Sequence, residues 1–223
     1  MKTCLALAFT FIGSLTVFAQ VKPDNKDFFF YDLSYLSLMN NGGGLEQQGF
    51  SNGHSLTLMG EKLFGTSRVG IGYGIGYSSE NYYTNMAIST NPVNGDEVYT
   101  VLNVDSAGAK NKFNQKFVDG AIELRFRTKQ ANNGRFFRFY VGAKGGIRFA
   151  GYSEFVNNDL NVQYRDIDEF SRFHGSVYAR IGYGFISLYG SYGLTPIFKS
   201  GVTDTGFMLE DLRPLANGLS ISI

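Results

Sequence analysis

Seven charged residues of both signs are the side chains in this sequence that could most readily take part in ion pairing or proton transfer. They are Asp119, Glu123, Arg125, Arg138, Lys144, Arg148 and Arg180, all in stretches where polar and apolar residues alternate. Alternate residues of a β-strand share one face, so the spacing predicts that all seven point to the same side. Buried charges are costly unless they are paired, and we therefore expect salt bridges between neighbouring strands. An ion or proton path is the alternative, for which an interior filled by side chains leaves little room.

The two histidines raise the questions of metal binding and of catalysis. His54 and His174 lack carboxylate partners at matching positions, so we predict no metal site and no cofactor. His174 and Ser176 resemble the His-x-Ser pair of lipid A deacylase barrels, in which a Glu orients the histidine. Such a pair must face lipid, whereas here it falls on the polar face, and the next strand, 186–194, contains no Glu. We therefore predict no catalytic residue and a protein that is not an enzyme.

The elements that would position these residues are β-strands. The stretch from Arg172 to Thr195 has the clearest strand pattern. Apolar and polar residues alternate along both of its halves around a tight turn at 183–185, which is typical of a β-hairpin. Each half runs about ten residues, near the length with which a tilted strand crosses a bilayer. Charged residues make up only 17% of the chain and aromatic residues 16%, so a water-facing barrel would lack a charged coat. The pattern favours a barrel with an apolar outer face in lipid and a polar lumen.

Eight strands can be assigned in this way along the chain. Their ranges are 28–38, 54–62, 68–79, 117–127, 136–152, 172–182, 186–194 and 215–223. The alternation slips near Leu36, which indicates a bulge, and every second residue of 68–79 is glycine or serine, which predicts that bulky groups approach that face. The connections are alternately long and short. The predicted fold class is all-β: an eight-stranded antiparallel transmembrane β-barrel of the OmpA/OmpX size, with long extracellular loops and short periplasmic turns.

The N-terminal segment has the features of a signal peptide. One Lys is followed by an apolar run from Cys4 to Phe18, and small residues at Val17 and Ala19 predict cleavage after residue 19. A membrane anchor is the alternative, but the run is shorter than the roughly 20 residues that a spanning helix needs. Residues 20–223 would then form the outer-membrane β-barrel domain, without a cysteine. We expect this domain in the outer membrane of a Gram-negative bacterium.

The connection 80–112 is the longest and the best candidate for binding a partner. Asn94-Gly95 stands between 87–90 and 98–104, which predicts a small hairpin above the membrane. A hairpin edge can accept a strand from another protein, and Tyr82, Tyr83 and Tyr99 are the expected contact residues. Net charge is +1 and there is no basic run, which argues against nucleic acid. We expect a monomeric barrel whose partners are outer-membrane lipids and proteins bound through extracellular loops or periplasmic turns.

Three stretches resemble a known family. FVDGAIELRFRTK (Phe117 to Lys129), the stretch from Arg172 to Phe198 and the C-terminal GLSISI are similar to PorT-like outer-membrane β-barrel proteins of Bacteroidetes. PorT is a component of the type IX secretion machinery, so the resemblance implies a role in the cell envelope that supports protein secretion. We expect a structural or interaction role, with this support as its most specific form. A barrel enzyme of the lipid A deacylase type and a narrow pore are the alternatives.

Overall fold

The computed structural model describes most of the chain as one barrel. The described residues are 27–39, 45–65, 68–90, 97–101, 110–132, 134–156, 161–165, 167–199, 203–204 and 207–223. The predicted signal peptide, 1–19, and the predicted turn Asn94-Gly95 lie outside them. Within the described residues, no helix is long and apolar enough to cross a membrane.

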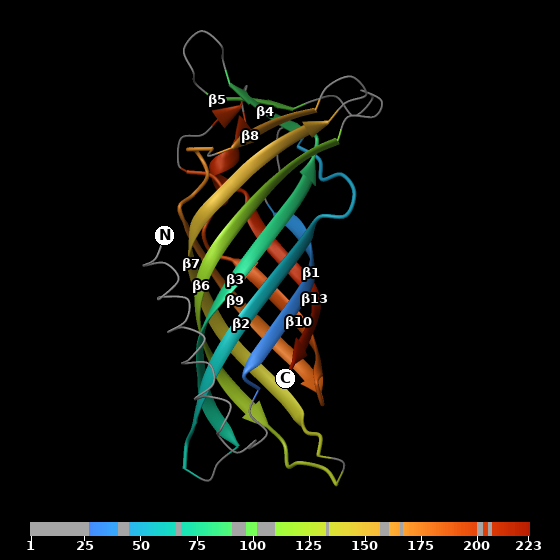
Figure 1. Cartoon of the computed structure of the whole chain (residues 1–223), viewed down its shortest axis with the longest axis vertical. Helices are drawn as coiled ribbons and strands as arrows, with labels where there is room; N and C mark the ends of the chain where they lie inside the picture. Colours follow the sequence, from blue (N-terminus) through green and yellow to red (C-terminus); the bar gives the residue numbers. More distant parts are fainter. Residues whose placement is uncertain are drawn as a thin grey trace, which may run out of the picture.

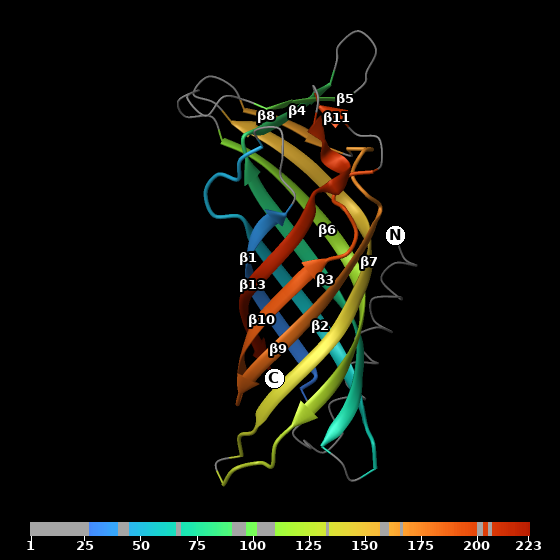
Figure 2. The same ribbon diagram turned by 180° about the vertical axis from the view of Figure 1, so that it is seen from behind.

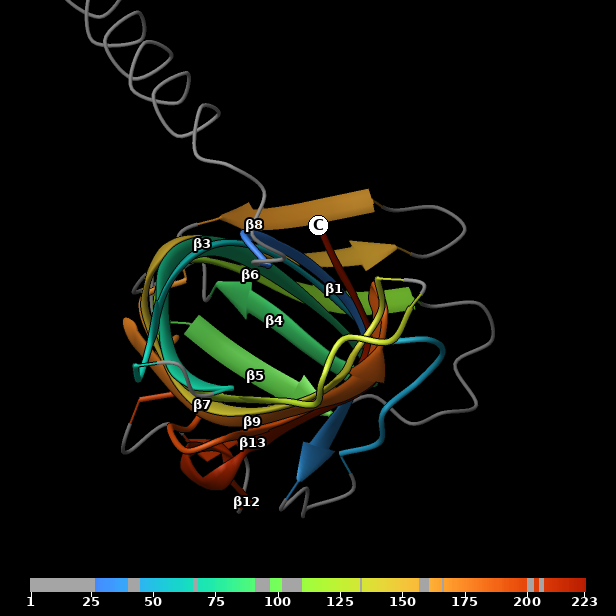
Figure 3. The ribbon, with the colours of Figure 1, turned by 90° about the horizontal axis from the view of Figure 1, so that it is seen from below.

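Eight antiparallel strands form a closed barrel in which each strand pairs with its neighbours in chain order (Figures 1 and 3). They are β1 (Phe29–Met39), β2 (Asn52–Leu63), β3 (Val69–Thr84), β6 (Lys110–Arg127), β7 (Phe137–Val156), β9 (Phe173–Tyr183), β10 (Ile186–Gly193) and β13 (Arg213–Ser222). The pairing of β1 with β13 joins the two ends of the sheet. The eight-stranded barrel predicted from the sequence is therefore confirmed.

Apolar side chains cover the outside of this barrel. The residues predicted to face outward do so: Ile71, Tyr73, Ile122, Leu124, Val141, Val177 and Leu188. Leu188 is 63% exposed and Ile122 57% exposed, values that belong to a surface in contact with lipid rather than to a packed core. Outward aromatic pairs mark the two edges of this apolar band. Phe137 contacts Tyr183 at 4.9 Å between ring centroids near the short turns, and Tyr77 contacts Phe149 at 6.1 Å toward the long loops.

Three strands continue past the apolar band, further than the sequence predicts. β3 ends at Thr84, β6 begins at Lys110 and β7 ends at Val156, beyond the predicted limits at 79, 117 and 152. The extension exists because inward apolar residues still pack there, such as Tyr82 and Phe113, whose rings stack at 4.9 Å. Pro214 likewise lies inside β13, one residue before the predicted start of that strand.

Short elements lie at the end of the barrel that carries the long connections, which we take as the extracellular end. The predicted hairpin is present as β4 (Met86–Thr90) and β5 (Glu97–Val101), which pair with each other. β8 (Asn161–Arg165) adds to the edge of β7. The segment between β10 and β13 holds β11 (Thr203–Asp204), β12 (Phe207–Met208) and the 3-10 helix η1 (Leu209–Asp211). Figure 2 shows β4, β5, β8 and β11 together at this end, and Figure 3 shows β4 and β5 lying across the extracellular opening of the barrel.

The bulge predicted near Leu36 is wrong. β1 pairs in unbroken register with both β13 and β2, and Leu36 and Leu38 point inward like Asp32 and Ser34 before them. The apparent slip arises because the prediction assigns apolar residues to the outer face, whereas the upper lumen is itself apolar. The observed irregularity lies between β6 and β7, where Lys116 pairs with Ala150 and Phe117 with Arg148, leaving Phe149 as the extra residue.

Candidate functional site in the lumen

Glu123 of β6 is the centre of a buried ion-paired network in the lumen. Its two carboxylate oxygens lie 2.7 Å from Arg125 Nε and 2.8 Å from Arg180 Nη1. The hydroxyl of Tyr178 donates a further hydrogen bond of 2.8 Å to the same carboxylate. All of these side chains are buried. The alternation of β6 and β9 aims them inward, and both strands pair with β7, so that Glu123 and Tyr178 lie on either side of Gly142.

Arg180 extends this network to a third strand. Its Nη2 lies 2.8 Å from Asp32 Oδ2 on β1, and Ser55 of β2 donates to the same oxygen at 3.3 Å. The guanidinium also lies over the ring of Phe30, 4.5 Å from its centroid. Arg180 therefore links β6, β9 and β1 while its apolar faces are covered by aromatic rings, which reduces the cost of burying the charge.

A second cluster closes the periplasmic end of the lumen. Asp27, just before β1, accepts hydrogen bonds from Arg138 Nη1 at 2.9 Å and from the Tyr140 hydroxyl at 2.7 Å. Arg127 lies 3.4 Å from the same carboxylate and 2.8 Å from Glu61. Arg138 also donates to Ser222 of β13. We call Asp27, Glu61, Arg127, Arg138 and Tyr140 the mouth cluster.

The structure brings together some of the seven predicted charges and separates others. Lys144 lies 3.9 Å from Asp119, higher in the lumen than Glu123. Arg148 lies six positions along β7 from Gly142, the register partner of Glu123. Its guanidinium donates to the backbone carbonyls of Ile167, Ser171 and Phe170 at 3.3 Å. Arg148 thus holds an extracellular segment in place, outside the group around Glu123.

Sequence reasoning missed three acidic members of these groups. Asp32 lies on the predicted polar face of the first strand, so the alternation of that strand was enough to identify it as a lumen carboxylate. Glu61 lies in the strand with the weakest alternation. Asp27 precedes β1, so no strand period reaches it. Each of Arg180, Arg127 and Arg138 forms an ion pair with at least one of these three carboxylates.

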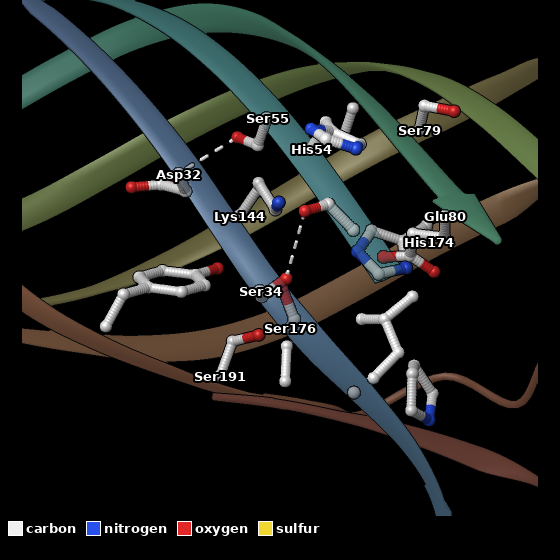
Figure 4. A pocket seen from close by; sticks show the side chains of 17 residues that line it. Asp32, Ser34, His54, Ser55, Ser79, Glu80, Lys144, His174, Ser176 and Ser191 are labelled. Atoms are coloured by element: carbon white, nitrogen blue, oxygen red, sulfur yellow. Dashed lines mark hydrogen bonds between the residues drawn. The ribbon is translucent and has the colours of Figure 1, made fainter. Parts of the chain in front are cut away.

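A polar chamber lies on the extracellular side of the network around Glu123. Lys144, Ser34, Ser55, Glu80, His174 and Ser176 are among its lining residues and come from five different strands (Figure 4). His174 and Ser176 are buried and face the lumen, with the His174 ring 4.8 Å from that of Phe117. His54 lies on the outer face instead, where its Nδ1 is 2.8 Å from the Tyr31 hydroxyl. Among the described residues, no group of three or more His, Cys, Asp or Glu could hold a metal ion.

Apolar side chains fill the extracellular end of the lumen. We call this set the apolar plug: Leu36, Leu38, Leu45, Tyr82, Met86, Phe113, Ile167, Phe170, Ile197, Phe198, Leu209 and Leu212. Phe170, Phe198, Leu209 and Leu212 have no exposed surface, and they come from the loops between strands, which fold into the barrel.

Tyr82, predicted as a partner contact, belongs to this plug, and the prediction is wrong for this residue. It is fully buried, and its hydroxyl donates to Glu80 at 2.7 Å. Tyr82 points inward because it stands an even number of positions from Ser78 and Glu80, which face the lumen. Tyr83, on the opposite face, is half-buried, and the side chain of Tyr99 lies outside the described ones.

A family model described as outer membrane protein beta-barrel domain matches residues 8–199. No curated protein matches the chain. The match covers all the barrel strands except β13.

Proposed function

Because this chain belongs to the outer membrane protein beta-barrel domain family, we propose that it is a closed, monomeric barrel with a structural or protein-interaction role in the outer membrane of a Gram-negative bacterium. Lipids would contact its apolar outer band. Its activity would reside in the extracellular elements and the periplasmic turns. Support of protein secretion, of the kind provided by PorT, is the most specific form of this proposal.

The observation that carries the proposal is the filling of the lumen at both ends. The mouth cluster and the network around Glu123 occupy the periplasmic half, where Arg125 and Tyr140 have no exposed surface. The apolar plug occupies the other end. A channel needs a continuous polar path, and an eight-stranded barrel has an interior just wide enough for side chains to fill. These arrangements argue against transport through the lumen and favour a function on the surfaces of the barrel outside the lumen.

The extracellular extension supports the interaction role. Three strands run past the apolar band, β3, β6 and β7, and β8 pairs with the edge of β7. The hairpin of β4 and β5 covers the extracellular opening (Figure 1). A paired sheet above the membrane gives a binding surface a rigid base, which loops alone do not.

Trimming the hairpin tests this role. The variant replaces residues 88–108 by a short Gly-Ser linker, keeping Met86 in the plug and the Thr84–Asn111 pairing of β3 with β6. Loop closure depends weakly on length, so the barrel should still assemble and show heat-dependent gel mobility. Tagged wild type, cross-linked in outer membranes, should capture protein partners that the variant does not. A variant that retains every partner and phenotype would disprove the interaction role of this hairpin.

Two further measurements separate the alternatives. The wild-type protein in planar bilayers should give negligible conductance, and a steady current changed by Arg180→Glu would instead indicate a pore. His174→Ala should leave lipid composition and partner capture unchanged, because the His174 ring faces the lumen and not the lipid. An altered lipid pattern in this variant would favour the enzyme.

A further inference from the structure

The polar chamber contains several buried groups whose hydrogen-bonding capacity the described residues do not use. His174 Nε2 and Ser176 Oγ have no hydrogen-bond partner among those residues, and both side chains are more than nine-tenths buried. The Lys144 side chain is 9% exposed, and its ion pair with Asp119, at 3.9 Å, is longer than a hydrogen bond. An ammonium has three N–H donors. Leaving such groups unsatisfied is costly, and buried polar groups in folded proteins are nearly always bonded to protein, water or an ion.

The size of the chamber limits what could satisfy these groups. Its cavity volume is about 20 Å³. By the same kind of measure one water molecule needs roughly 10–15 Å³, so there is room for one or two waters or for a monatomic ion. A sugar, a nucleotide or a lipid head group is far too large.

The charges around the chamber decide between an ion and water. Lys144 repels a cation, while Glu80 and Asp32 line the same space and repel an anion. An ion of either sign would therefore lie beside at least one like charge in a buried space, where such repulsion is weakly screened. A water molecule is neutral and both donates and accepts hydrogen bonds. It can accept from the Lys144 ammonium and donate to a second group.

We propose that the chamber is a binding site for one or two ordered water molecules that bridge the Lys144 ammonium to the side chains of His174 and Ser176. This water lies between the network around Glu123 on one side and the apolar plug on the other. It completes the solvation of a buried lysine in mid-membrane without opening a path across the barrel.

A neighbouring cavity indicates the side from which this water exchanges. It has a volume of about 10 Å³ and shares Glu80, His174 and Pro214 with the chamber. Its other lining residues include Gln115, whose Nε2 has no partner among the described residues, and Pro196 in the connection after β10. Exchange would therefore pass His174 toward the extracellular end.

Water-selective nuclear Overhauser measurements on the full barrel, refolded in lipid nanodiscs, test the proposal. We expect cross-peaks from long-lived water to the His174 ring protons and the Ser176 Hβ protons. Met59, buried against Phe30 and Tyr140, is the internal control and should show none. Absence of the His174 and Ser176 cross-peaks would overturn the proposal. So would a bromide or rubidium anomalous peak within hydrogen-bond distance of Lys144 Nζ in soaked crystals.

A pair of variants tests whether the occupant fills the space beside Ser176. Ser176→Val replaces the hydroxyl by a methyl group and adds a second methyl group where the water is proposed, so the His174 cross-peak should disappear. Ser176→Ala removes the hydroxyl without filling the space, and the cross-peak should remain. Heat-dependent gel mobility checks that each variant is folded. A His174 cross-peak that persists in Ser176→Val, or vanishes in a folded Ser176→Ala, would overturn the proposed position.

Discussion

Glu123 and Arg180 are 57 residues apart in the chain and joined by a 2.8 Å ion pair inside the barrel. The pair connects β6 to β9, two strands that are not neighbours in the sheet because β7 lies between them. It therefore spans β7 at Gly142, which pairs with Glu123 on one side and with Tyr178 on the other, rather than lying along one hydrogen-bonded pair of strands. Arg180 has a second carboxylate partner in Asp32, and Glu123 has a second cation in Arg125, so each charge is held from two sides.

Glu123→Gln should destabilise the barrel strongly. The substitution keeps the volume but removes the charge that neutralises Arg125 and Arg180, both buried. Breaking a buried pair from one side costs about 3–5 kcal/mol, because the other charge is left unmatched. Urea unfolding of the protein in lipid vesicles measures the loss. Glu46→Gln, at an exposed carboxylate, is the control, and equal effects of the two changes would mean that water solvates the network.

Two glycines in paired strands should respond differently to the same substitution. A Cβ on Gly142 of β7 would lie 2.5 Å from the Ile122 carbonyl oxygen and 2.8 Å from Cζ of Tyr178. A Cβ on the outward Gly120 of β6 would meet nothing closer than 3.8 Å. Gly142→Ala should therefore cost about 1–3 kcal/mol of unfolding free energy through overpacking. Gly120→Ala should be neutral or slightly stabilising, and a large loss there would contradict this account of the lumen.

A double-mutant cycle should show that Asp27 fastens the start of β1 through Arg138. The two side chains are 2.9 Å apart at the periplasmic mouth, so Asp27→Asn and Arg138→Met should couple by about 0.5–3 kcal/mol. Asp27→Asn combined with Lys112→Met is the control, since Lys112 pairs with Glu154 at the opposite end. That pair of changes should be additive within about 0.5 kcal/mol. Additivity in the first cycle would mean that Asp27 does not hold the mouth closed.

Tyr82→Phe should change the alkaline limit of stability. Tyr82 lies beyond the apolar band, and its burial, together with the nearby Glu80 carboxylate, raises the pKa of its phenol well above the ordinary value. A raised pKa favours the neutral phenol in the folded state. That stabilisation is complete below the unfolded pKa of about 10 and declines as the pH rises from there toward the folded value.

The Tyr82→Phe variant lacks this titrating group, so its stability should fall less steeply than that of the wild type above about pH 10. At neutral pH the substitution should cost about 1.5–3 kcal/mol, because Glu80 loses a hydrogen-bond donor. Urea midpoints measured across the alkaline range give both quantities. Tyr83→Phe, one residue along on the opposite face of β3, is the control. Parallel pH curves for wild type and Tyr82→Phe would contradict the assignment.

The sequence alone determined which side chains face lipid and how many strands the barrel has. Ile122 and Leu188 could be placed on the outer face because strand alternation is a local property with a period of two residues. The glycine row of β3 correctly predicted a close approach, since a Cβ on Gly72 would lie 2.6 Å from Arg125 Nε. The number of strands followed from the spacing of turns and loops, which is equally local.

Only the tertiary structure decided which charges meet and where the lumen is polar. The partners of Arg180 lie on β1 and β6, and their depth depends on the stagger of strands that closure of the barrel imposes. Asp27 stands before β1, beyond the reach of any strand period. Strand alternation points Leu36 and Tyr82 inward, and these side chains are buried in an apolar environment there because the loops fold back and turn the upper lumen into a core. Alternation identifies two faces of a strand, but the surroundings of each face are set by distant segments of the chain.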